Sequence, residues 1–220
     1  MTHGVLRRAA RALAPTAALL ALSALPAVAQ DPDPFAKLEN NRFAVELLID
    51  SANAAGLPSN PLREVALQGI AKHADGRKIV DAVRKELGLL RIAREALSTG
   101  DEQELTAAAS VLRAGAKPTQ LSTFRARKKG RTVLEPFIDW ADFLQRGVPN
   151  EEAYTAITKL WQDGADDDTF HSLWTNVKAD ISQGLNPGTA LQNRIREGPG
   201  RASPATVKPP EGQQENQSSR

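Results

Sequence analysis

The chain contains no cysteine, which excludes disulfide bonds, thiolate metal sites and cysteine nucleophiles. If it folds in an oxidising compartment, its stability depends on packing alone. Histidine is scarce, with three among 220 residues. No Gly-x-Ser-x-Gly turn, phosphate-binding glycine loop or His-Glu-x-x-His pair is present. We therefore expect no catalytic residue, no metal and no cofactor, and the sequence favours a protein that is not an enzyme.

Strand patterns are also missing, because no segment alternates apolar and polar residues in a stretch rich in Val, Ile, Thr and Tyr. Successive segments instead place apolar residues at helical spacing. The longest runs from Lys78 to Leu97. The sequence thus predicts an all-α fold, either a compact helical bundle or a short α-solenoid, of about eight to nine short amphipathic helices joined by glycine-led turns.

The N-terminus has the three parts of a secretory signal peptide. Basic residues in Arg7–Arg11 precede an apolar run, Leu13–Leu25, and small residues follow at Ala27 and Ala29. We predict a signal peptide at residues 1–29, cleavage between Ala29 and Gln30, and a periplasmic or secreted product. The alternative, an uncleaved anchor, is disfavoured because the apolar run is shorter than the roughly 20 residues of a membrane span.

Removal of residues 1–29 leaves 25 basic and 26 acidic residues, a net charge of −1. Such a balance gives no general reason to bind nucleic acid, and we expect neither a nucleic-acid partner nor a membrane span in the mature chain. Residues 30–197 are predicted to form a single all-helical domain. From Gly198 to Arg220 apolar periodicity is lost, which predicts a disordered tail over 198–220.

A repeated cassette marks the helix boundaries. A glycine is followed by an apolar residue, then by a proline or capping residue, and by another apolar residue six positions after the glycine. Glycine takes the left-handed conformation that ends one helix, and the proline or polar residue begins the next. A coarser repeat of three helices, starting at positions 56, 115 and 164, leaves internal duplication open. The glycines of the cassette are Gly56, Gly115, Gly147, Gly164 and Gly184.

Two features stand out between positions 137 and 174. Seven of the ten aromatic residues lie there, and Trp140, Trp161 and Trp174 form either part of the core or the wall of a ligand groove; we expect core. An acidic run at Asp163 and 166–168, with His171 nearby, forms either a metal site or a helix N-cap. The spacing is not that of a calcium loop, so we expect the cap.

A basic run is the candidate binding surface. It consists of Arg125, Arg127, Lys128, Lys129 and Arg131. These cations form either a grip for an anionic surface or a solvated helix end, where the helix dipole favours positive charge. Together with the acidic run, they leave weak self-association open.

Two carboxylate pairs, Asp139 with Asp142 and Glu151 with Glu152, have the residue types used in glycoside hydrolysis. Nothing in the sequence places two of them across a cleft. The sequence therefore favours an exported binding or scaffolding protein of the cell envelope, whose partner is a protein or another envelope component. The alternative is an envelope hydrolase that uses helix-borne carboxylates.

Overall fold

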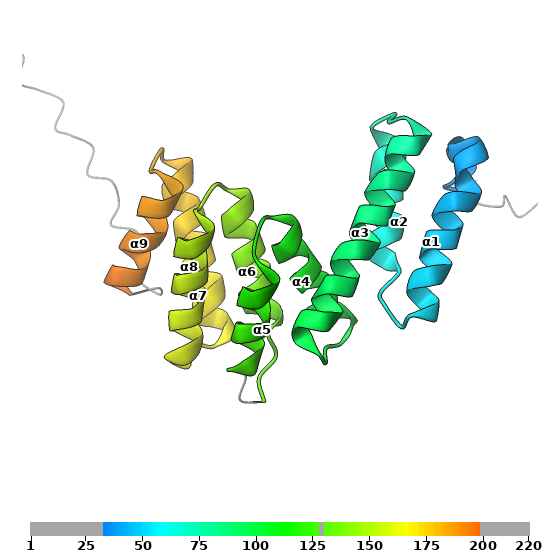
Figure 1. Ribbon diagram of the computed structural model, residues 1–220. Helices are drawn as coiled ribbons and strands as arrows, with labels where there is room; N and C mark the ends of the chain where they lie inside the picture. Colours follow the sequence, from blue (N-terminus) through cyan, green and yellow to red (C-terminus); the bar gives the residue numbers. More distant parts are fainter. Residues whose placement is uncertain (1–32, 128–129, 199–220) are drawn as a thin grey trace, which may run out of the picture. The chain divides into compact units, whose positions relative to one another are not determined.

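The computed structural model describes residues 33–127 and 130–198. This part of the chain forms one 3-10 helix, nine α-helices and no strand (Figure 1), which confirms the all-helical prediction. The predicted signal peptide and all but the first residue of the predicted tail lie outside the described residues. The elements are η1 (Ala36–Asn41), α1 (Arg42–Ala54), α2 (Asn60–Ala71), α3 (Gly76–Leu97), α4 (Glu102–Arg113), α5 (Pro118–Ala126), α6 (Leu134–Gln145), α7 (Asn150–Gln162), α8 (Asp167–Ser182) and α9 (Pro187–Glu197).

From α2 onward the helices pack in two layers. Contacts of α4 with α6 and of α6 with α8 build one layer, and contacts of α3 with α5 and of α7 with α9 build the other. Helices that follow one another, such as α2 and α3, α6 and α7, or α8 and α9, join the layers. This contact pattern, in which each helix touches mainly helices near it in sequence, is that of a short α-solenoid.

The glycine-led turns follow the expected chemistry. After α6, the backbone N–H of Val148 donates to the carbonyl of Phe143 at 3.0 Å, and after α7 that of Ala165 donates to Leu160 at 3.0 Å. Such bonds close a helix when the intervening glycine is left-handed. The φ values are +63° at Gly56, +111° at Gly115, +87° at Gly147, +85° at Gly164 and +95° at Gly184.

Side-chain caps begin several helices. Asp166 accepts from the backbone N–H of Thr169 at 2.9 Å, which identifies this part of the acidic run as the N-cap of α8. Asp101 caps α4 by accepting from the N–H of Glu104 at 2.8 Å.

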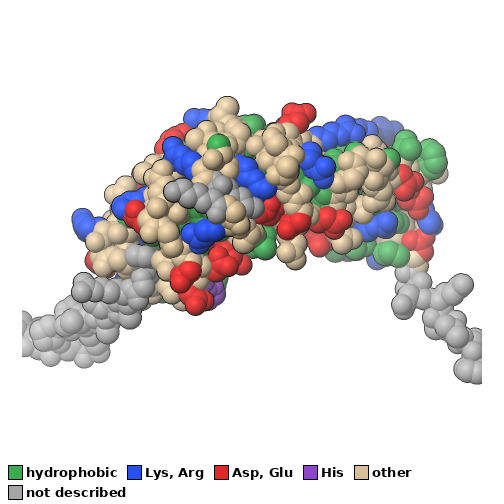
Figure 2. Space-filling view, turned by 90° about the horizontal axis from the view of Figure 1, so that it is seen from below, with side chains coloured by type: hydrophobic (Ala, Val, Ile, Leu, Met, Phe, Trp, Pro, Cys, Tyr) green, Lys and Arg blue, Asp and Glu red, His purple; other side chains and the backbone are tan. Residues whose placement is uncertain are grey.

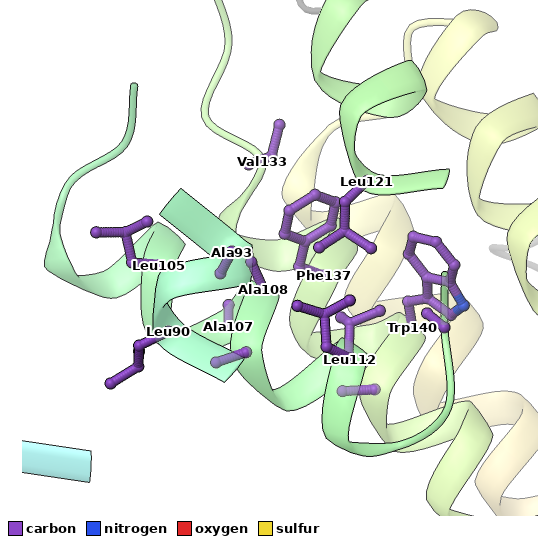
Figure 3. Close-up of a cluster of buried hydrophobic side chains, with 14 of the residues drawn as sticks. Leu90, Ala93, Leu105, Ala107, Ala108, Leu112, Leu121, Val133, Phe137 and Trp140 are labelled. Carbon is purple, nitrogen blue, oxygen red and sulfur yellow. The ribbon is translucent and has the colours of Figure 1, made fainter. Parts of the chain in front are cut away.

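The core is continuous from layer to layer. Figure 3 shows side chains of α3, α4, α5 and α6 meeting around Leu112 and Phe137. Trp140 is fully buried and Trp161 is 6% exposed, so both belong to the core as expected. Trp174 is half-buried; it packs against the core and also lines a surface cleft.

Candidate functional site

A cleft of about 850 Å³ lies on the surface of the described part of the chain. Its lining comes from α2, α4, α6 and α8, the four helices of one layer, together with the turn before α2. Pro61, Leu134 and Ile138 give it apolar surface. Helical repeat proteins use an extended face of this kind, formed by one layer of helices, to bind partners.

The charged side chains that line the cleft are nearly all acidic. Glu64 comes from α2 and Glu102 from α4, while α6 contributes Glu135, Asp139 and Asp142. No lysine or arginine is found among the described residues that line it. Figure 2 shows acidic side chains along the lower edge of the view, with a histidine beside them. The cleft is therefore strongly negative in a chain whose overall charge is close to neutral.

Asp139 is the unusual member of this group. Its side chain lines the cleft, yet the residue is only 4% exposed, and its Oδ2 has no hydrogen-bond partner among the described residues. Burial, together with the nearby negative charges of Glu135 and Asp142, raises the pKa of Asp139 to about 8. At neutral pH the Asp139 carboxyl is therefore mostly protonated and neutral.

Asp142, one helical turn further on, has an ordinary set of partners. Its Oδ2 accepts from Arg146 Nε at 2.9 Å and from the indole N–H of Trp174. The Trp174 ring stacks on His171 at 6.0 Å between centroids, and Lys178 Nζ lies 4.5 Å from its centroid. These contacts fix Trp174 as a rigid wall beside the carboxyl groups.

The arrangement supplies two kinds of carboxyl group in one cleft. Asp139 is a buried neutral acid that can donate a proton or pair with an incoming cation, and Asp142 is partnered by a cation. A strongly shifted acid in a cleft is a common mark of a functional site. Within the described ranges, no group of three or more His, Asp or Glu side chains is arranged to hold a metal ion.

The structure describes three of the five residues of the predicted basic run, and their surroundings differ. Arg125 is mostly buried and donates to Glu104 at 3.0 Å and to the carbonyl of Thr99 at 2.8 Å. Arg131 donates to the carbonyl of Ala165, and its guanidinium lies 4.4 Å from the centre of the Trp161 ring. Arg127 is exposed. Lys128 and Lys129 lie outside the described residues.

The remaining carboxylates that stood out in the sequence do not line the cleft. Asp163 pairs with Lys159 at 2.5 Å, so the acidic run divides into an ion pair and a helix cap. Glu151 pairs with Lys117 at 2.9 Å. Glu151 and Glu152 line a different hollow between α7 and α9.

From the sequence we identified Asp139 and Asp142 only as one of two carboxylate pairs. The other acidic residues of the cleft, Glu64, Glu102 and Glu135, were not predicted. One signal was available. Positions 135, 139 and 142 follow helical spacing, and like charges so placed repel one another in an isolated helix. Because this repulsion destabilises the helix, an acidic stripe of this kind indicates that the carboxylates serve a function rather than helix stability.

No helix in residues 33–127 and 130–198 combines the length and apolar character needed to cross a bilayer. Comparisons with protein-family models, with curated proteins and with solved structures find no match to this chain.

Proposed function

We propose that this chain is an exported binding or scaffolding protein of the cell envelope, and that it holds an extended segment of a partner protein in the cleft of α2, α4, α6 and α8. The observation that carries the proposal is that one layer of four helices forms the cleft. The three-part N-terminal sequence supports export.

The lining of the cleft suits a peptide. Apolar side chains such as Pro61 and Ile138 can contact apolar side chains of the ligand, while the amides of Asn60, Gln103 and Gln145 can donate to and accept from a peptide backbone. Compared with a peptide, a sugar would need fewer apolar contacts. The surface of a globular partner would contact less of the cleft lining than an extended peptide.

The test uses a random peptide library selected on the full chain, followed by affinity measurements on the selected peptides. Ile138 lines the cleft and is 44% exposed, so Ile138→Arg fills the cleft with a cation without disturbing the core. We expect at least tenfold weaker binding. Leu185, 38% exposed and outside the cleft lining, is the matched control, and Leu185→Arg should change affinity less than twofold. Equal effects of the two substitutions, or no selected peptide, would contradict a peptide-binding cleft.

A second candidate function, an envelope hydrolase, is favoured by the raised pKa of Asp139. A carboxyl that stays protonated at neutral pH can act as a general acid, and Glu102 on α4 can act as a base toward water. Incubation with polysaccharide and peptide substrates should then release products in a reaction that is lost in both Asp139→Asn and Glu102→Gln. Absence of turnover on every substrate would exclude this alternative.

A further inference from the structure

The Asp139 carboxyl in the cleft lacks a hydrogen-bond donor that a ligand could supply. Asp139 is 4% exposed, and its Oδ2 faces no donor among the described residues. A buried oxygen without a donor is costly, and native proteins satisfy nearly all such groups. A ligand that brings a donor to this oxygen would remove the cost.

The charge around this position selects a cation as that donor. The ionisable groups of the cleft lining from each helix are Glu64 on α2, Glu102 on α4, Glu135 and Asp142 on α6, and His171 on α8. Beyond the lining, Arg146 pairs with Asp142, and Lys178 lies against the Trp174 ring. Among the described residues, no cation is paired with Glu64, Glu102 or Glu135. The site therefore has excess negative charge.

We propose that the Asp139 position of the cleft binds a basic side chain, the ammonium of a lysine or the guanidinium of an arginine, carried by the partner peptide. This inference rests on the proposed peptide-binding function and names the chemistry that the cleft recognises. The Asp139 carboxylate accepts from the cation, and Glu135 and Asp142 stabilise its charge. Neighbouring apolar surface from Leu134 and Ile138 accommodates the methylene groups of the side chain.

Binding of a cation is coupled to a proton. At pH 6 to 7 the Asp139 carboxyl is protonated, and the incoming cation favours its ionised form. The proton is then released to solvent, so affinity for a basic peptide should rise with pH up to about 8. For one released proton the rise is up to about tenfold per pH unit.

The test compares acetylated five-residue peptide amides that have Arg, Lys, citrulline or norleucine between alanines. Citrulline keeps the shape of arginine but has no charge. By titration calorimetry on the full chain, we expect the Arg and Lys peptides to bind at least tenfold more tightly than the other two. Calorimetry in two buffers of different ionisation enthalpy should reveal proton release below pH 8.

Variants separate Asp139 from the remaining acids. Asp139→Asn should remove most of the preference for the charged peptides and abolish proton release. Asp163→Asn, a change of the same type on an exposed aspartate paired with Lys159, should alter neither. His171→Gln should keep the dependence between pH 7 and 8, because the inferred titrating group is Asp139.

Two outcomes distinguish this inference from the function on which it rests. If library peptides bind in the cleft but Arg and citrulline bind equally, or if Asp139→Asn retains the preference, the cation site is wrong and the binding function stands. If no peptide binding depends on Ile138, both are wrong. Calcium ions that compete for Asp139 better than the Arg peptide would also overturn the assignment of an organic cation.

Discussion

Two buried aspartates, Asp180 on α8 and Asp139 on α6, have opposite surroundings. Asp180 is 5% exposed and accepts two bonds of 2.6 Å from Arg194 on α9, itself 3% exposed. Asp139 is equally buried, but its Oδ2 has no partner among the described residues. The chain can thus place a cation on a buried carboxylate, and it does so where two helices must be joined. Asp139 instead lines a cleft, and none of the described cations is paired with it.

The largest effect should come from breaking the Asp180 pair. Arg194→Met removes the cation that pairs with the buried Asp180 carboxylate, so we expect the free energy of unfolding to fall by about 3–5 kcal/mol. Urea denaturation at pH 7 measures the change. Arg196→Met, on the exposed face of the same helix, is the control and should stay within about 0.5 kcal/mol of wild type. A small effect of Arg194→Met would show that the pair does not hold α8 and α9 together.

At Asp139 we expect a substitution to raise the free energy of unfolding rather than lower it. Its folded pKa of about 8 lies above the ordinary value of 3.8, so the unfolded chain loses this proton first as pH rises. Stability from the protonated carboxyl is complete below about pH 4 and is lost between pH 4 and 8. Asp139→Asn keeps the neutral form at every pH.

We therefore expect Asp139→Asn to raise the free energy of unfolding by about 2 kcal/mol at pH 7.5 and to change it little at pH 4. The gross linkage is larger, at about 1.4 kcal/mol per pKa unit, but the new amide has donors of its own to satisfy. Paired denaturation curves at the two pH values measure this. Destabilisation at pH 7.5 would mean that Asp139 is ionised and has a partner in the folded protein.

The smallest effect should come from the neighbour of Asp139. Glu135→Gln removes a like charge that raises the Asp139 pKa, so that pKa should fall. The fall should be modest, because burial is the main cause of the shift. Carboxyl carbon NMR of Asp139 during a pH titration measures it, with Glu46→Gln on α1 as the control. An unchanged Asp139 pKa would mean that the charge of Glu135 does not contribute, and would leave burial and Asp142 as the causes of the shift.

The same contrast shows what sequence patterns can and cannot predict. Helix positions, the glycine turns and the Asp166 cap depend on neighbours within a few residues, and those were predictable. The surroundings of Asp139 were not, because packing of α4, α7 and α8 against α6 buries most sides of that helix. Phe137, Trp140 and Phe143 are fully buried, and Asp139 lies between them in sequence.

Likewise, nothing local indicates that Arg125 turns inward. Its partner Glu104 is 21 residues earlier, and the Glu104 carboxylate also accepts from the backbone N–H of Val133 at 3.0 Å. A run of cations in sequence is therefore no guide to a surface patch once buried acids compete for its members. The helices could be predicted from neighbouring residues. The partner of each charged side chain could not, because it depends on how helices far apart in the sequence pack together.

The stacking of the helices has a consequence for how the protein opens. Since each helix contacts mainly helices near it in sequence, opening of the α8–α9 end need not disturb α2 and α3, and amide hydrogen exchange should vary along the chain. A segment lying across α2, α4, α6 and α8 would touch all four helices at once. Such a ligand would hold these helices together, so that the bound protein opens as a whole, whereas the free protein opens first at its ends.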